Sequence, residues 1–223
     1  MYQVVRRWLI AVFQLIIFGN GYIALCAVVM CQTTVKLFHL HIPGPFLPFM
    51  FAGTLGSYCL HVCLTDTSVA TVSAGHSDRE RWIDAHKPGL LGVFIVSMLI
   101  GGWLLMQLDA YLTDLLPVVV LTFLYTAPKI NWGPFRALRR IAILKTTYLS
   151  LVWTYATVAL PILLATPGGR INWVLAGVWM LNRFLLIYSI ALCFDYRDRE
   201  VDRQSKWLTI VSRLSGRQAQ LFL

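Results

Sequence analysis

The sequence predicts an all-α, polytopic transmembrane helix bundle because of its composition, its long apolar segments and the placement of its basic residues. Hydrophobic residues make up 58% of the 223 positions and charged residues only 13%, and the mean hydropathy is +0.68. Soluble domains carry about 25% charged residues. A bilayer therefore explains this composition better than a buried core in water does.

Several apolar segments are long enough to cross about 30 Å of hydrocarbon as helices. No hydrophilic stretch of domain size separates them, so we predict one integral-membrane domain over residues 1–223. The first segment lacks a small-residue cleavage site and is longer than the apolar part of a signal peptide, so we expect it to remain as an anchor. The predicted spans are 8–30, 44–65, 89–108, 111–128, 146–165 and 171–194.

Basic residues gather on one side of these spans. Sixteen of the 19 Lys and Arg residues lie at the N-terminus or after the second, fourth and sixth spans, whereas only Lys36 and Arg170 fall on the opposite side. The positive-inside rule therefore places the N-terminus and these segments in the cytoplasm. The net charge of +9 is interpreted as a basic rim that attracts anionic lipid headgroups. Nucleic acid is not an expected partner, because the charge is divided among short loops.

An acidic segment directly follows the sixth span. Four of the ten acidic residues lie between Asp195 and Asp202. If the helix continues, Asp195, Asp198 and Asp202 lie within about 60° of one another on one face. Such carboxylates repel one another unless a cation lies between them, and oxygen ligands suit Mg²⁺, which also binds phosphate oxygens. The pattern thus predicts a site for magnesium and diphosphate at the membrane surface.

Basic residues alternate with these carboxylates, which leaves a second interpretation open. Arg197, Arg199 and Arg203 could pair with the acids along a solvated extension of the helix. Arginines on other faces of the same helix could equally clamp phosphate beside a metal. The residue types alone do not choose between the two interpretations.

A hydroxyl and an ammonium group close the fourth span on the same predicted side. Tyr125 and Lys129 are four residues apart, at the expected depth of the acidic segment. Diphosphate needs such donors to hold its non-bridging oxygens and to stabilise charge on the leaving group. The alternative is an interfacial tyrosine followed by a positive-inside lysine, as in many membrane helices.

Taken together, these segments resemble the UbiA superfamily of intramembrane prenyltransferases. The stretch from Asp195 to Arg203 is similar to its second aspartate-rich motif, and Tyr125-x-x-x-Lys129 is similar to its Y-x-x-x-K element. The stretch 138–161 resembles a divergent bacterial branch of the group. As an analogy at the level of the fold, the resemblance implies about nine spans around a central cavity that is open to lipid at the side, in a bacterial inner (plasma) membrane.

The resemblance also implies chemistry. It predicts a prenyltransferase that moves an isoprenyl group from a polyprenyl diphosphate to a lipophilic acceptor, with Mg²⁺ as cofactor. Carried over by position, the metal ligands are Asp195, Asp198, Asp202 and Asp66; the diphosphate contacts are Lys129, Arg199 and Arg203; and Tyr125 and Lys129 have catalytic roles.

The chain departs from the family pattern at two places. The first motif, N-x-x-x-D-x-x-x-D, is replaced by Ser57–Asp66, which holds one carboxylate. His61 there is a second candidate ligand, although a lone membrane histidine is more often hydrogen-bonded within a bundle. The family also continues for about three further spans, so we expect residues 1–223 to be incomplete at the C-terminus.

These departures keep other functions open. The first alternative is a catalytically degenerate protein that binds prenyl lipid or has a structural role. The second is a small transporter, which should show paired interrupted spans in two related halves.

Two further features carry expectations. The connection Ser77–Lys87 is expected to lie along the membrane interface with Trp82 at headgroup level, or to cap the cavity. Arg183, near the middle of the sixth span, is expected to face the bundle interior toward a partner. No acid lies at a similar depth, so we expect that partner on a helix beyond residue 223.

Overall fold

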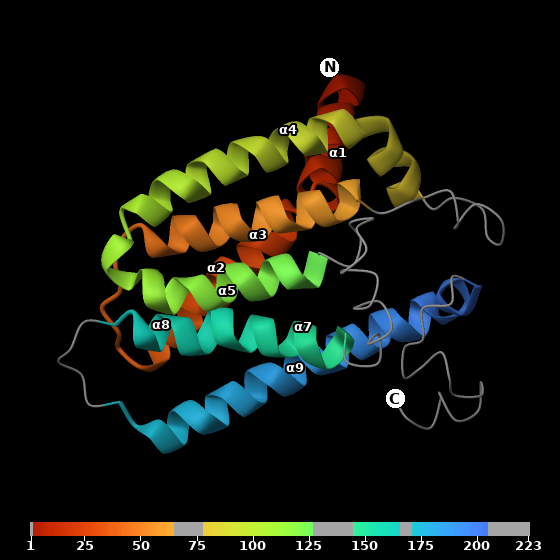
Figure 1. Ribbon diagram of the computed structural model, residues 1–223. Coiled ribbons are helices and arrows are strands. Elements are labelled where there is room, and N and C mark those ends of the chain that lie inside the picture. The colour runs from red at the N-terminus through yellow and green to blue at the C-terminus, as the bar shows by residue number, and fades with distance from the viewer. Residues whose placement is uncertain (1, 65–77, 127–144, 166–170, 205–223) are drawn as a thin grey trace.

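The computed structural model describes residues 2–64, 78–126, 145–165 and 171–204. Every regular element in these ranges is helical, and most of the helices run side by side as a bundle (Figure 1). The prediction of an all-α fold is thereby confirmed. The helical segments that are long and apolar enough to cross a bilayer are Phe46–Cys63, Arg81–Met106, Asp109–Thr126, Thr146–Leu163 and Trp173–Arg197.

The first predicted span is wrong as a single helix. The chain forms α1 (Tyr2–Phe18) and α2 (Gly21–Leu37), which meet at an angle of 62°. Asn20 has φ 66°, in the left-handed region that asparagine tolerates better than most residues. A Cβ atom at Gly19 would lie 2.2 Å from the carbonyl oxygen of Leu15, so the bend requires glycine there.

Helix α3 (Phe46–Cys63) and helix α4 (Asp78–Met106) pack against each other along much of their length. Glycine permits the close approach, because a Cβ atom at Gly56 would lie 2.5 Å from the Cε atom of Met98. These two helices form one wall of the bundle (Figure 1).

Helix α4 begins well before the predicted third span. The connection expected along the interface or over the cavity is helical from Asp78 onward and forms the first turns of α4; its position at the membrane interface stays a prediction. Trp82 packs edge-on against Phe18 of α1, with ring centroids 5.7 Å apart. Pro88 lies inside the helix and cannot donate a hydrogen bond to the preceding turn. The first turns of α4 bend away from the rest of the helix near this point (Figure 1).

A short 3-10 turn, η2 (Asp109–Tyr111), joins α4 to α5 (Leu112–Thr126). The next span consists of α7 (Lys145–Thr154), the π turn η5 (Tyr155–Ala159) and α8 (Leu160–Leu163).

Proline accounts for the π turn. Pro161 has no N–H group to donate to the carbonyl of Thr157, four residues earlier. That carbonyl instead accepts a hydrogen bond of 2.7 Å from the hydroxyl of Thr34 on α2. The amide of Leu160, the residue before the proline, bonds to the carbonyl of Tyr155, five residues back. The proline thus opens the helix at the point where α2 packs against it.

Helix α9 (Trp173–Gln204) extends ten residues past the predicted sixth span, which ended at residue 194. It therefore carries the whole acidic segment as helix, which is the condition under which Asp195, Asp198 and Asp202 share one face. The ends of α3, α5 and α9 and the starts of α4 and α7 lie at one end of the bundle (Figure 1). We refer to this end as the predicted cytoplasmic end and to the opposite one as the outer end.

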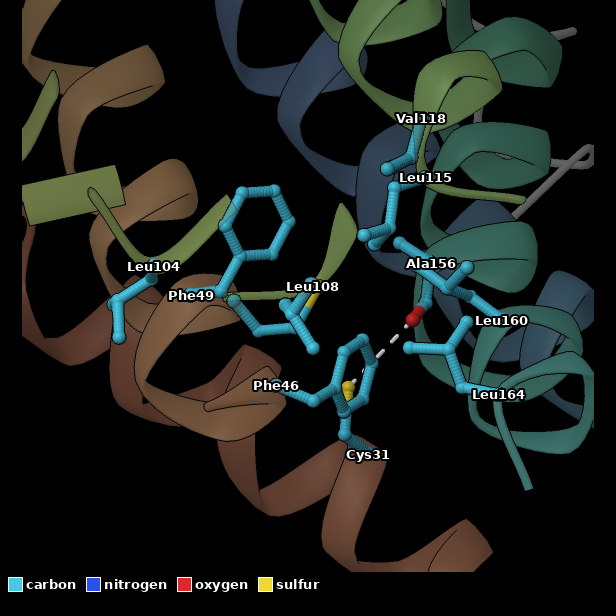
Figure 2. Packing of buried hydrophobic residues seen from close by; sticks show 11 residues of the cluster. Cys31, Phe46, Phe49, Leu104, Leu108, Leu115, Val118, Ala156, Leu160 and Leu164 are labelled. Carbon is cyan, nitrogen blue, oxygen red and sulfur yellow. Dashed lines mark hydrogen bonds between the residues drawn. The ribbon is translucent and has the colours of Figure 1, made fainter. Parts of the chain in front are cut away.

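Near the outer end, side chains from α2, α3, α4, α5 and the α7–α8 span converge in an apolar core (Figure 2). The thiol of Cys31 donates a hydrogen bond to the carbonyl of Ala156 within it. This outer apolar cluster consists of Cys31, Phe46, Phe49, Met50, Leu104, Leu108, Leu115, Val118, Ala156, Leu160 and Leu164.

Candidate functional site

A cavity of about 390 Å³ lies among α3, α4, α5 and the α7 span. Its walls are largely apolar. On α3 the lining runs from Phe49 to His61, which corresponds to about 18 Å along a helix at 1.5 Å per residue. Phe49, Met50 and Val118 belong both to the lining and to the outer apolar cluster. The cluster therefore borders the cavity toward the outer end.

Three aromatic rings stack at the predicted cytoplasmic end. The rings of His61 and Tyr125, which both line the cavity, have centroids 5.3 Å apart and planes inclined by 20°. Tyr148 continues the stack, with its centroid 6.4 Å from that of Tyr125 and its plane inclined by 3°. The Tyr148 hydroxyl donates to the carbonyl of Leu121 over 2.6 Å, which fixes its ring. This aromatic column joins α3, α5 and α7.

The first carboxylate of the acidic segment lies beside this column. Asp195 is only 9% exposed, and its Oδ2 atom accepts a hydrogen bond of 2.5 Å from the hydroxyl of Thr146. Thr146 precedes Tyr148 by two residues on α7, and the Tyr148 ring stacks on Tyr125. Thr146 lies in the first turn of α7, where the helix dipole favours a negative charge. Two of the predicted site residues, Tyr125 and Asp195, are thus brought together.

The remaining predicted site residues are not placed. Lys129 and Asp66 lie outside the described residues. The backbone of α9 passes through the other four positions, whose side chains also lie outside the description: Asp198, Arg199, Asp202 and Arg203. In the described ranges, no group of three or more His, Cys, Asp or Glu residues could hold a metal ion. The predicted metal site stays a prediction.

Sequence reasoning missed two members of the site, Thr146 and Tyr148, and the ring contact of His61. His61 and Tyr125 both lie in the last turns of their predicted spans, so a common depth was a signal for their contact. The polar residues that open the fifth span were a signal for Thr146. Neither signal says which way a side chain points.

The cavity has an opening on its side. Most of its lining residues are buried or half-buried, but four are exposed, and all four lie on α4 and α5. Met98 is 41% exposed, Val119 43% and Phe123 49%; the fourth is Gly102. We call these four residues the side opening. In a bilayer, an opening between two apolar membrane-spanning helices faces lipid.

Arg183 forms a separate polar contact deeper in the bundle. It is 5% exposed, and its Nη2 atom donates to the carbonyl of Met30 over 3.3 Å and to the hydroxyl of Thr33 over 3.2 Å. Its guanidinium lies 5.2 Å from the centre of the Trp179 ring. The expectation that Arg183 faces the bundle interior toward a partner is confirmed, and α2 supplies the partners described here; an acidic partner beyond residue 223 stays a prediction.

No family model, curated protein or solved structure matches the chain. The function must therefore be argued from the arrangement of these residues.

Proposed function

We propose that this protein is a UbiA-type membrane prenyltransferase, which transfers an isoprenyl group from a polyprenyl diphosphate to a lipophilic acceptor with the help of Mg²⁺. One observation carries the proposal. Tyr125 and Asp195 belong to two motifs far apart in the sequence, yet α7 brings them together at the predicted cytoplasmic end of an apolar cavity, where Thr146 donates to Asp195 and Tyr148 stacks on Tyr125.

The cavity suits an isoprenoid chain. Its length of about 18 Å along α3 exceeds the roughly 15 Å of hydrocarbon in one leaflet of a bilayer. Its walls offer apolar contacts over this length, and a chain inside them stays out of water. The diphosphate of such a substrate would then lie at the polar end, beside the aromatic column.

The residues at that end fit a magnesium diphosphate. Asp195 offers carboxylate oxygen held in place by Thr146, and the spacing of Asp198 and Asp202 puts two further acids on the same helix face. Within the part of the chain that the structure describes, Asp195 has no basic partner within salt-bridge distance. A buried carboxylate is costly without a positive charge nearby, which favours a cation here. When bound, Mg²⁺ would neutralise charge on the departing diphosphate.

The protein's own groups would assist the transfer itself. The bond between the isoprenyl carbon and the diphosphate oxygen breaks, and the diphosphate leaves with the electron pair. The resulting allylic cation would be stabilised by aromatic rings that line the cavity, such as Tyr58 and Trp153, since a desolvated cation over an aromatic ring gains about 2 kcal/mol. A nucleophilic carbon or oxygen of the acceptor then forms the new bond and releases a proton. The apolar walls exclude water, which would otherwise capture the cation.

The test uses the protein in lipid nanodiscs with farnesyl or geranylgeranyl diphosphate and an aromatic acceptor. We expect Mg²⁺-dependent release of diphosphate and a prenylated product. The double variant Asp198→Ala/Asp202→Ala should lower the rate at least about 100-fold, because the charge on the leaving group is then poorly neutralised. Asp109→Ala is the matched control, since Asp109 is an exposed acid at the outer end. Unchanged activity in the double variant would refute the assigned roles.

One observation favours a second candidate, a protein that binds prenyl lipid without turnover. The described part of the segment that replaces the first acidic motif contributes His61, whose ring stacks on Tyr125. Equilibrium binding of a prenyl diphosphate, with no diphosphate released at any Mg²⁺ concentration, would support this candidate over the enzyme.

A further inference from the structure

Helix α9 carries one amide side chain on its lipid-facing side at mid-span. The helix lies at one edge of the bundle (Figure 1) and packs mainly against the α7 span. Asn182 is exposed and lies nine residues after Trp173 and thirteen before Asp195, about 14 Å and 20 Å away along the helix axis. No described residue forms a hydrogen bond with its side-chain amide. In a bilayer, this amide would lie in the hydrocarbon core without a partner.

Four exposed positions of α9 follow one another along a single line. We call them the α9 seam, which consists of Val178, Asn182, Leu185 and Ser189. Their spacing of four, three and four residues is the spacing with which two helices interdigitate. The hydroxyl of Ser189 donates to the carbonyl of Leu185 over 2.8 Å, and its small side chain permits the close approach of a second helix. Asn182 therefore holds the one side-chain polar group of the seam that has no partner among the described residues.

The amide of Asn182 is matched best by a copy of itself. A carboxamide has two N–H donors and a carbonyl acceptor, so two carboxamides can donate to each other. All copies have the same predicted orientation in the membrane. A two-fold axis along the membrane normal therefore brings the Asn182 side chains of two copies to the same depth. Any other protein partner would need a polar group of its own that faces lipid at this depth.

We propose that the protein forms a homodimer in the membrane, in which the α9 seams of two copies pack together and their Asn182 amides are hydrogen-bonded to each other. An amide left in hydrocarbon is costly, and the dimer removes this cost for both copies. Arg183 and Asp195 are buried on another side of α9, so the dimer leaves their contacts in place. The side opening lies on other helices, α4 and α5, outside the interface. The dimer does not depend on the proposed function.

The test is the association of the protein in liposomes at increasing protein-to-lipid ratios. Chains that carry one fluorophore at the N-terminus are counted by single-molecule photobleaching, which gives a dissociation constant in the membrane. We expect dimers, and we expect Asn182→Leu to raise this dissociation constant about tenfold, because the interhelical hydrogen bonds are lost. Asn182→Gln should stay within about threefold of wild type, since the glutamine amide also donates and accepts.

Gln107→Leu is the matched control for the leucine variant. It also replaces an exposed amide by leucine, but beside the end of α4 and outside the seam, so the dissociation constant should not change. A dissociation constant that is equal in Asn182→Leu and wild type would overturn the proposal. Monomers at every density would also overturn it, and would leave the seam to lipid or to another protein helix.

A second measurement uses the wild-type chain and does not depend on the folding of a variant. Cys193 lies eleven residues after Asn182, about 16 Å further toward the predicted cytoplasmic end and about 20° away around the helix. Cys193 is exposed, whereas the other cysteines are buried or half-buried. A short bismaleimide should therefore join two copies through Cys193, and Cys193→Ser should abolish this product. Wild-type dimers that form no such product would pack through another face, which would overturn the proposal.

Discussion

Helix α9 buries a charge at two depths, and the surroundings of the two charges differ. Arg183 lies twelve residues before Asp195, about 18 Å away along the helix axis. Protein groups surround the guanidinium at mid-bundle: a carbonyl and a hydroxyl of α2, and the ring of Trp179. Among the described residues, Asp195 has one hydroxyl donor, Thr146 of α7, and Tyr148 of the same helix stacks on Tyr125 at the end of the cavity.

The difference separates a charge that holds helices together from one that remains available to a ligand. A buried charge is tolerated in a membrane only when partners satisfy it. For Arg183 these partners belong to the protein, so its contribution is to packing. Asp195 offers further acceptor positions to a cation, because a carboxylate can accept about four hydrogen bonds. Stability should therefore depend on Arg183 and catalysis on Asp195.

The largest expected effect is that of Asp195→Asn on activity. The amide oxygen still accepts the hydrogen bond from Thr146, so the midpoint of thermal unfolding should change little. Loss of the negative charge should lower the Mg²⁺-dependent rate of prenyl transfer about 100-fold or more. Diphosphate release and a melting curve on the same preparation measure the two quantities. Activity within threefold of wild type would contradict a catalytic role for the negative charge of Asp195.

Arg183→Met should have the opposite profile. It removes two hydrogen bonds to α2 and the contact with Trp179, which together are worth about 1–3 kcal/mol. We expect a lower unfolding midpoint and an unchanged rate per folded molecule. Arg81→Met is the control, since Arg81 makes an exposed ion pair with Asp78 that contributes less than about 1 kcal/mol. Equal midpoints for the two variants would contradict the structural role of Arg183.

The variant Thr146→Val tests whether the hydroxyl of Thr146 orients the carboxylate of Asp195. Without the hydroxyl, the carboxylate loses its fixed orientation, and we expect the rate to fall about tenfold at saturating substrate. Thr146→Ser should restore most of it, because the serine hydroxyl reaches the same oxygen. A positioning role predicts that the concentration of Mg²⁺ needed for half-maximal rate rises in the valine variant only. An equal Mg²⁺ requirement in both variants would show that Thr146 is only a packing residue.

Trp179→Phe should have the smallest effect. It removes the hydrogen bond of 3.1 Å from the indole Nε1 atom to the hydroxyl of Thr34 and keeps a ring beneath Arg183. Interhelical hydrogen bonds in membranes average about 0.6 kcal/mol, so we expect a small drop in the unfolding midpoint. Trp173→Phe, at an exposed position, should leave the midpoint unchanged. A drop in the midpoint as large as that of Arg183→Met would mean that Trp179, rather than the charge of Arg183, accounts for the stability of this region.

Much of the fold follows from local properties of the chain. Apolar segments bounded by charged loops located the helices now seen as α3, α5, the α7–α8 span and α9, whereas α9 continues ten residues past the end predicted for it. The prediction missed the bend before Gly21, although Gly19-Asn20-Gly21 interrupts the apolar run there with turn-forming residues. The bend depends on a tertiary contact, in which the buried side chain of Asn20 donates to the sulfur of Cys59 on α3.

The site was harder to predict for a physical reason. Helices surrounded by lipid are apolar on most faces, so their periodicity does not fix their rotation about their own axes. Depth in the membrane was therefore predictable, and Tyr125 and Asp195 were assigned to the same level. The contacts of His61 and Thr146 depend on rotation, which becomes fixed only when all the helices pack.

The π turn at Tyr155–Ala159 has a consequence for how homologues would align with this chain. A π turn is in effect one residue inserted into an α-helix, and the insertion rotates everything after it by about 100°. A relative with no proline at the position of Pro161 has no reason to keep the extra residue. Its alignment should then show a one-position gap between 155 and 159, and a comparison made without that gap would pair lipid-facing residues of one protein with core residues of the other.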